Sequence, residues 1–199
     1  MVDEQTRKAY DTCAVQYAQK KIKEMSLLEE QITDFLFKER MRILDLGSGP
    51  GQYAELFSKK GHEVLCVDAS PIMIALCQEK NLPAMVMDIE HLHLYGMYDG
   101  IWANASLLHI PKERLPQIIK QLHGLLMPEG VLHVSVKEGT TEGYVATESY
   151  PGELRYYAYY QDEEVRALFS DFSLQVMRRM EREEEIFLNY LWKNDPDEM

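Results

Sequence analysis

The chain has 199 residues, of which 46% are hydrophobic and 27% are charged, as in an ordinary soluble globular protein. One domain of this length buries roughly 70% of its unfolded surface, so we expect a single domain over residues 1–199. The 33 acidic residues outnumber the 21 basic ones, which gives a formal net charge of −12. This charge makes nucleic acid an unlikely partner and disfavours an anionic membrane, because both require clustered basic side chains.

The three cysteines, Cys13, Cys66 and Cys77, are odd in number and lack the spacing of metal ligands. We therefore expect reduced thiols, no metal site and a cytoplasmic location. No apolar run has the length of a signal peptide or a membrane span, so no membrane association is expected.

The first forty residues are expected to be helical. Tyr10, Ala14, Tyr17 and Ala18 recur at the spacing of one helix face, and a second apolar set repeats this pattern over 27–36. The first strand therefore follows a helical segment.

That strand covers 43–46 and leads into a turn with Gly47, Gly49 and Gly51. Glycines allow the backbone to come close to a ligand, and the helix that follows offers unpaired N–H groups at its start. A dinucleotide-binding turn would have glycine at the place of Gln52. The spacing here is instead G-x-G-x-G, with Asp45 inside the preceding strand.

Acidic residues also end the next two predicted strands. Asp68 follows the strand 62–67, and Asp88 follows the strand 84–87. Ligands in open α/β sheets collect at the carboxyl ends of strands, so we expect Asp45, Asp68 and Asp88 at one binding edge. A carboxylate placed like Asp68 can accept two hydrogen bonds from ribose hydroxyls.

The rest of the chain continues this alternation of strands and helices. We predict strands over 98–103 and 131–136, with a helix over 112–126 between them. Residues 140–161 show no clear period and are rich in tyrosine, which favours an irregular loop covering the site, although 157–160 also suit a strand. A helix over 162–169 and strands over 172–177 and 185–192, joined through 178–184, complete the prediction.

Three motifs resemble the class I S-adenosylmethionine-dependent methyltransferases. Asp45 and the G-x-G-x-G turn resemble motif I of this family, and residues 10–17 resemble its Tyr-Asp-x-x-Ala-x-x-Tyr opening. The Tyr-Asp-Gly-Ile strand that begins at Tyr98 is also similar. The resemblance is specific up to about residue 111 and looser beyond, where Pro-Glu-Gly at 128–130 stands for the family's Pro-Gly-Gly.

The resemblance implies an α/β three-layer sandwich with a seven-stranded, mostly parallel sheet and an antiparallel last strand. It implies a helical lid (1–40), a cofactor-binding half (41–139), and a substrate loop with closing strands (140–199). The cofactor would be S-adenosyl-L-methionine and its product S-adenosyl-L-homocysteine. The implied cofactor-binding residues are Tyr17, Asp45, Gly47, Ser48, Gly49, Gly51, Asp68, Ala69, Met73, Asp88, Ile89, Asn104 and Ala105.

The implied activity is methyl transfer to an O or N nucleophile of a small molecule, by in-line displacement without a metal. His109 is the first candidate for a base or substrate orienter, because histidine titrates near neutrality, followed by Glu138 and Tyr157. The alternative for His109, which the position favours slightly, is a polar packing residue at the mouth of the helix after the fourth strand. A protein or RNA acceptor and a non-catalytic cofactor-binding module remain alternatives, and the protein is expected to be a monomer or homodimer.

Overall fold

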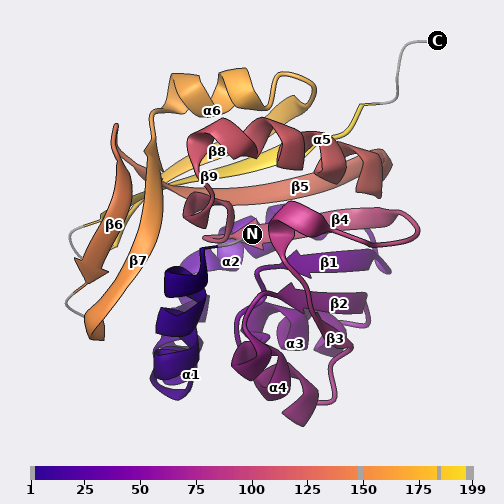
Figure 1. The fold of residues 1–199 in the computed structure, drawn as a ribbon. Helices are drawn as coiled ribbons and strands as arrows, with labels where there is room; N and C mark the ends of the chain where they lie inside the picture. Colours follow the sequence, from indigo (N-terminus) through magenta and orange to yellow (C-terminus); the bar gives the residue numbers. More distant parts are fainter. Residues whose placement is uncertain (1–2, 148–149, 183–184, 196–199) are drawn as a thin grey trace.

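The structure is a computed structural model that describes residues 3–147, 150–182 and 185–195. Figure 1 shows a twisted sheet with helices on both faces and a long two-stranded hairpin at one end. The helices are α1 (Glu4–Glu24), α2 (Glu29–Phe35), α3 (Gln52–Lys59), α4 (Pro71–Glu79), α5 (Leu115–Leu125) and α6 (Asp162–Leu168), with 3₁₀ turns η1 (Met25–Leu28), η2 (Ile89–His91), η3 (Leu107–His109) and η4 (Lys112–Arg114). The strands are β1 (Arg42–Leu46), β2 (Glu63–Asp68), β3 (Ala84–Val86), β4 (Tyr98–Asn104), β5 (Leu126–Glu138), β6 (Glu142–Thr147), β7 (Tyr150–Tyr160), β8 (Ser173–Arg182) and β9 (Glu185–Lys193).

The main sheet has the order β3-β2-β1-β4-β5-β9-β8. The first five of these strands run parallel to one another. Strand β9 is antiparallel to both β5 and β8. The predicted fold class, mostly parallel with an antiparallel last strand, is confirmed. This arrangement brings the carboxyl ends of β1, β2 and β4 to one edge of the sheet.

Two apolar clusters fill the space between the helices and the sheet. One contains buried residues of α2, α3 and α4, and the other contains those of α5 and α6. In the first cluster the fully buried Trp102 packs its ring 5.1 Å from that of Phe35 and 5.5 Å from that of Phe57. The alternation of strand residues between the two faces therefore produces the three layers.

The N-terminal helix α1 lies outside these layers, against β7 and α4 (Figure 1). It begins at Asp3, whose carboxylate accepts a hydrogen bond of 2.8 Å from the amide of Thr6 and so caps the helix. The expected helix before the first strand is present. No helix in the described ranges is long and apolar enough to cross a membrane.

Residues 140–161 were expected as an irregular loop, with a strand as the alternative for 157–160; strands β6 and β7 instead pair with each other along most of this segment. Tyr144 pairs across the hairpin with Tyr156, and the last residues of β7 pair in parallel with the end of β5. Tyr157, Ala158 and Tyr160 are buried, and only Tyr159 in this run is partly accessible. Because β7 is covered on both faces, its sequence lacks the polar and apolar alternation by which strands are recognised.

Strand β8 extends further than predicted, through most of the charged segment expected to be a turn. Arg178 forms ion pairs with Glu30 and Asp34 of α2. Its neighbour Arg179 turns to the other side and pairs with Glu138 of β5 at 2.9 Å. These ion pairs provide partners for two neighbouring arginines that point to opposite faces of the strand. Residues 183 and 184 of the predicted turn lie outside the described residues.

Candidate functional site

A pocket that is partly open to solvent lies at the carboxyl ends of β1, β2 and β4. Helix α1 contributes one wall, and the turn after β1, the start of α4, η2 and η3 contribute the others. The predicted cofactor residues that line it are Tyr17, Asp45, Gly47, Ser48, Gly49, Asp68, Ala69, Met73, Ile89, Asn104 and Ala105. Two predicted members, Gly51 and Asp88, do not line it.

The glycine turn is held close to the sheet by the end of β2. The amides of Gly47 and Ser48 both donate to the carbonyl of Val67, at 2.8 and 3.0 Å. Gly47 has a φ of +71°, and a Cβ there would lie 2.4 Å from the Cβ of Ser106. A side chain at this position would therefore collide with the pocket wall.

Gly51 has a packing role beneath the pocket. It precedes α3 with a φ of +75°, and a Cβ there would lie 2.8 Å from the sulfur of Cys77 and 2.9 Å from Leu82. This glycine lets the turn pack directly on the end of α4, which explains its place in the motif without a ligand contact.

Asp45 is the most deeply buried carboxylate of the pocket, with 2% of its surface exposed. Burial raises the pKa of its carboxyl group well above the ordinary value, and nearby Cys77 and Asp68 add to this effect. Its Oδ2 atom has no hydrogen-bond partner among the described residues. A buried acceptor without a partner is costly, so this oxygen is suited to a donor supplied by a ligand.

Asp68 connects the glycine turn to the start of α4. One carboxylate oxygen accepts from the amide of Gly49 at 2.9 Å, and the other accepts from the amide of Ser70 at 2.8 Å. Burial raises the pKa of the carboxyl group, while these two bonds act in the opposite direction. Each oxygen retains a second lone pair for a further donor.

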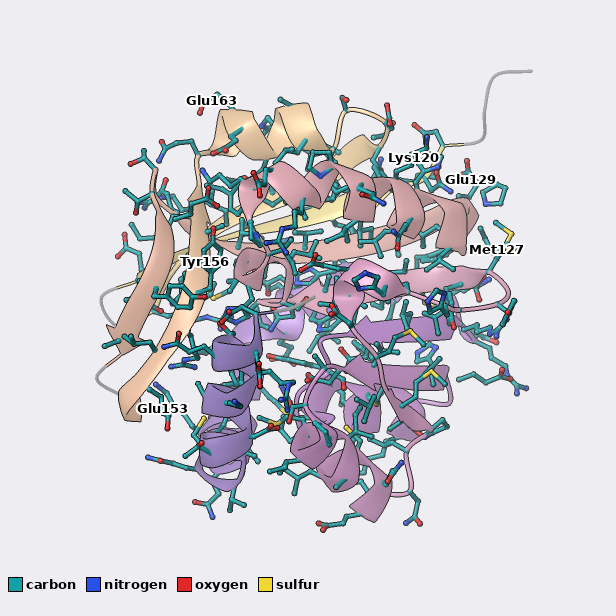
Figure 2. The ribbon with its side chains drawn as sticks, viewed as in Figure 1. Lys120, Met127, Glu129, Glu153, Tyr156 and Glu163 are labelled. Carbon is teal, nitrogen blue, oxygen red and sulfur yellow. The ribbon has the colours of Figure 1, made fainter. Side chains whose placement is uncertain are left out.

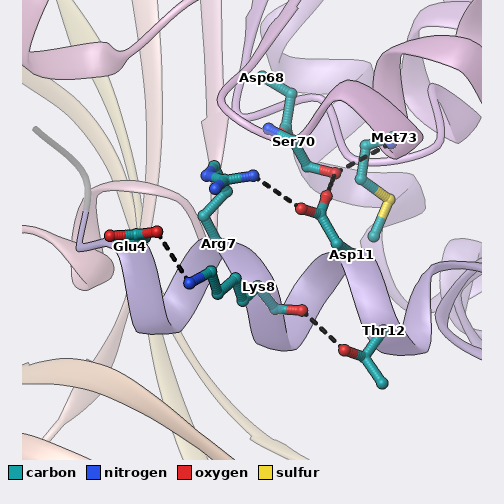
Figure 3. A network of polar contacts seen from close by, with 8 residues as sticks. All are labelled: Glu4, Arg7, Lys8, Asp11, Thr12, Asp68, Ser70 and Met73. Atoms are coloured by element: carbon teal, nitrogen blue, oxygen red, sulfur yellow. Dashed lines mark hydrogen bonds and ion pairs between the residues drawn. The ribbon is translucent and has the colours of Figure 1, made fainter.

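A chain of polar contacts attaches α1 to this edge of the pocket (Figure 3). Ser70 caps α4 by accepting a 3.1 Å hydrogen bond from the amide of Met73, and its hydroxyl donates to Asp11 of α1. Asp11 in turn forms an ion pair of 2.8 Å with Arg7, one helical turn earlier. The position of α1 is thus linked to the cap of α4.

The third strand-end acid does not reach the pocket. Asp88 accepts a 2.9 Å hydrogen bond from the amide of Glu90 and caps the short turn η2. The adjacent Ile89 is buried and lines the pocket instead. Asp88 therefore shapes the turn that presents Ile89.

The loop after β4 approaches the pocket in a strained conformation. Ala105 has a φ of +53°, which is unusual for a residue with a side chain, and its amide donates to the carbonyl of Ser135 at 3.2 Å. The next residue, Ser106, is 6% exposed, lines the pocket, and has a hydroxyl without a hydrogen-bond partner among the described residues. Ser106 is thus a second polar group available to a ligand.

His109 joins three elements at the far wall. Its Nε2 lies 2.7 Å from the hydroxyl of Tyr10 on α1, and its Nδ1 lies 2.7 Å from the carbonyl of Tyr156 on β7. Figure 2 labels Tyr156 on this hairpin. A carbonyl can only accept, so Nδ1 carries the proton and Nε2 accepts from Tyr10. Burial lowers the pKa of His109 to about 3, with Arg155 and Lys137 contributing, so the ring is neutral at pH 7.

The other two predicted catalytic residues lie outside the pocket lining. Tyr157 is buried behind His109, with ring centroids 4.8 Å apart, and the ammonium group of Lys137 lies 3.8 Å from its ring centroid. Glu138 ends β5 but turns toward Arg179 on β8. In the described part of the chain, no three His, Cys, Asp or Glu side chains form a group that could hold a metal ion.

Sequence reasoning did not assign a ligand-binding role to several pocket residues on α1. Thr6, Arg7 and Tyr10 line the pocket together with Tyr17. Thr6, Tyr10 and Tyr17 are four and seven residues apart, which places them on one face of the helix. The same helical spacing, followed back from Tyr17, identifies Tyr10 and Thr6 as candidates.

Comparisons with known proteins agree with this architecture. A family model described as a methyltransferase domain matches residues 43–130. Hemagglutinin 1 of Eikenella corrodens is 29% identical over 140 residues, covering 67% of this chain and 44% of that protein. Trans-aconitate 2-methyltransferase of Variovorax paradoxus is 31% identical over 110 residues, covering 52% of this chain and 41% of that protein. The chain thus spans less than half the length of these two relatives.

A solved structure extends the likeness of the fold to nearly the whole chain. The 1,6-didemethyltoxoflavin-N1-methyltransferase of Burkholderia thailandensis, solved with S-adenosylhomocysteine, aligns with a TM-score of 0.76. The alignment covers 96% of this chain and 87% of that one at 19% identity, which establishes a shared fold. The matched domain and the shared fold confirm the resemblance seen in the motifs. Residues 43–130 match a methyltransferase domain, and the chain shares the fold of a solved methyltransferase.

Proposed function

We propose that this protein binds S-adenosylmethionine in the pocket and catalyses transfer of its methyl group to an oxygen or nitrogen atom of a small molecule. The observation that carries the proposal is the unpartnered, buried oxygen of Asp45 beside the glycine turn. An ammonium group has three N–H donors and no acceptor, so the amino group of the cofactor suits this oxygen. The turn from Gly47 to Gly49 leaves room for the end of the cofactor that carries this amino group.

The nucleoside end fits the opposite side of the pocket. The two oxygens of Asp68 already accept one backbone amide each, and their remaining lone pairs suit the two ribose hydroxyls. Buried Met73 and Ile89 offer apolar surfaces for the adenine ring. In this assignment Ile89 contacts the adenine ring, while Asp88 and Gly51 support the pocket from outside.

A small acceptor is favoured by the way the pocket is covered. Tyr10 and Tyr17 of α1 lie over it with their rings 5.4 Å apart in an edge-on contact. Asp11 attaches the same helix to the start of α4, which narrows access to the pocket for a peptide or an RNA strand. The net charge of −12 is also unfavourable for an RNA acceptor.

The bound cofactor would supply an activated methyl group on a positively charged sulfur. The protein then has to align the acceptor in line with the bond that breaks, and this positioning supplies much of the rate acceleration. Asn104 and Ala105 lie where the loop after β4 approaches the pocket and would border the sulfur. His109 is better suited to holding Tyr10 in place than to accepting a proton, because both of its nitrogen atoms have partners.

The three free cysteines are all buried, which supports the expectation of reduced thiols and a cytoplasmic location. We propose that location together with the activity.

Calorimetric titration with S-adenosylhomocysteine tests the cofactor assignment. We expect micromolar or tighter binding by the unchanged protein, and at least about a tenfold weaker affinity for Asp45→Asn, since a bond to a charged partner contributes about 1.5–3 kcal/mol. Asp99→Asn is the control, because Asp99, near the start of β4, binds Lys38 and the amide of Arg42 at the start of β1. Unaltered affinity in the folded Asp45→Asn protein would remove the proposed role of Asp45.

A further inference from the structure

We propose that the methyl acceptor is a carboxylate, bound at the far end of the pocket by the guanidinium group of Arg7 and the hydroxyl of Ser106. This inference rests on the proposed methyl transfer and specifies its substrate class. We define the acceptor end as the pocket lining made by Thr6, Arg7, Tyr10, Ser106 and His109.

Most polar groups of the acceptor end are already engaged within the protein. The hydroxyl of Thr6 contacts the carboxylate of Asp3 at 3.1 Å and accepts from the amide of Tyr156 at 2.8 Å. The hydroxyl of Tyr10 donates to His109, whose other nitrogen donates to the Tyr156 carbonyl. These three side chains form a fixed wall.

Ser106 and Arg7 are the groups best placed to bind an acceptor. Ser106 is 94% buried, and its hydroxyl has no hydrogen-bond partner among the described residues. A guanidinium group has five N–H donors, and the ion pair with Asp11 involves one nitrogen of Arg7. Both residues line the pocket, and a hydroxyl donor and a guanidinium group together are suited to an anionic acceptor oxygen.

The charges around the acceptor end favour an anion. Arg155 of β7 is 3% exposed, and its guanidinium carbon lies 5.1 Å from the centroid of the Tyr10 ring, directly behind the wall. The carboxylates among the described pocket-lining residues are Asp45 and Asp68, both at the cofactor end. A buried cation acts strongly through a region of low dielectric, so an amine that carries a positive charge is disfavoured here.

The lack of an available proton acceptor at the acceptor end leads to the same substrate class. The lone pair of His109 Nε2 is occupied by the hydroxyl of Tyr10, and the low pKa of this histidine makes it a weak base at pH 7. An alcohol or an ammonium acceptor would have to lose a proton during transfer, whereas a carboxylate is already ionised. The carboxylate oxygen forms the new O–CH₃ bond, the C–S bond breaks with its electron pair left on sulfur, and no proton moves.

The stability of the product in alkali tests this substrate class. The protein is incubated with a small-metabolite extract and S-adenosylmethionine labelled in its methyl group, and the products are then treated with alkali. A methyl ester hydrolyses to volatile labelled methanol, whereas N-methyl groups and methyl ethers are stable. We expect protein-dependent label that becomes volatile. Label that stays entirely in the stable fraction would overturn the carboxylate assignment and leave methyl transfer itself intact.

Direct binding provides a readout that does not depend on turnover. The protein saturated with S-adenosylhomocysteine is titrated by calorimetry with a panel of di- and tricarboxylic acids and with their uncharged amides. We expect a carboxylic acid of the panel to bind at least about tenfold more tightly than its amide. Absence of this preference across the panel, together with absence of volatile label, would overturn the proposal.

Variants of the two binding residues then locate the site. Arg7→Gln and Ser106→Ala should each weaken carboxylate binding about tenfold or more, while affinity for S-adenosylhomocysteine changes less than about twofold. Arg166→Gln is the matched control for the arginine, because Arg166 and Asp162 form the same type of ion pair across one helical turn. Ser135→Ala is the control for the serine, since Ser135 also has a buried hydroxyl without a partner but does not line the pocket.

These measurements separate the two proposals. If S-adenosylhomocysteine fails to bind the unchanged protein, the proposed function itself is wrong. If it binds and the variants at Arg7 and Ser106 bind carboxylates as tightly as the controls do, the acceptor site assigned here is wrong. Loss of carboxylate binding in the variants alone supports both.

Discussion

The hydroxyl of Tyr10 donates a 2.7 Å hydrogen bond to Nε2 of His109, across 99 positions of the chain. The other nitrogen of the same ring binds the Tyr156 carbonyl at 2.7 Å, so one neutral histidine joins α1, η3 and β7. Since α1 forms a wall of the pocket, the geometry of the site depends on a side chain that the sequence suggests as a base.

Replacement of Tyr10 by phenylalanine should therefore destabilise the protein. The Tyr10→Phe change leaves a buried imidazole nitrogen without a donor, which costs about 1–3 kcal/mol. Urea denaturation measures this loss as a lower midpoint. Tyr95→Phe is the control, because Tyr95 is 91% exposed and should change stability by less than about 0.5 kcal/mol. Equal stability of the two variants would show that the bond between Tyr10 and His109 contributes little.

Folding stability should rise with pH between about 5 and 7 through the buried His133. Its ring is stacked 3.8 Å from that of Trp102, and burial lowers its pKa to about 3. Below its ordinary pKa of about 6.5 the unfolded chain binds a proton that the folded protein does not bind. The free energy of unfolding therefore falls as the pH is lowered, by up to about 1.4 kcal/mol per pH unit from this residue.

His133→Gln should make that pH dependence shallower. His109 has the same lowered pKa and keeps its own contribution, so part of the slope remains. Urea titrations at pH 5, 6 and 7 measure the slope for each variant. The exposed His93, changed to glutamine, serves as the control, and identical slopes for the two variants would contradict the prediction.

Two glycines with similar φ angles allow the cost of a side chain at positive φ to be distinguished from the cost of a steric clash. Gly51→Ala and Gly61→Ala both place a side chain at positive φ, +75° and +93° respectively. A methyl group at 51 meets the sulfur of Cys77 at 2.8 Å, whereas nothing lies within 4 Å at 61. We expect Gly61→Ala to cost about 1 kcal/mol and Gly51→Ala to cost at least about 1 kcal/mol more. Thermal or urea denaturation measures both losses, and equal losses would argue against tight packing of the turn on α4.

Helix α1 should loosen when its contact with α4 is removed. Asp11→Ala deletes the partner of both Ser70 and Arg7, so amides over residues 4–20 should exchange with solvent faster. Glu4→Ala is the control, because it removes an exposed ion pair with Lys8 on the same helix. Hydrogen exchange followed by mass spectrometry distinguishes them. Similar exchange in both variants would mean that Asp11 does not hold the helix in place.

The cofactor edge of this fold could be predicted from the sequence because its determinants are local. Asp45 and Asp68 each belong to a short apolar strand with turn residues directly after it, and parallel strands bring such ends together. Ser70 followed by proline likewise predicts the start of α4, where the serine caps the helix.

The sequence suggests His109 at the acceptor end, but the contacts of this residue could not be predicted in the same way, because they come from segments far apart in the chain. Tyr10, Ser106 and the Tyr156 carbonyl meet only after α1 packs on β7. The prediction for Glu138 rested on its position at the end of β5, but Glu138 pairs with Tyr160 of β7, and its carboxylate turns to Arg179. The unrecognised hairpin accounts for both differences.

That hairpin joins β5 through two residue pairs, Lys137 with Tyr159 and Glu138 with Tyr160. It nevertheless supplies the buried guanidinium of Arg155 and the carbonyl that orients His109. The proposed acceptor end therefore depends on a hairpin attached to the edge of β5, whereas the proposed cofactor site belongs to the main sheet itself. Under these assignments, exchange of β6 and β7 between related chains would alter acceptor preference and leave cofactor recognition unchanged.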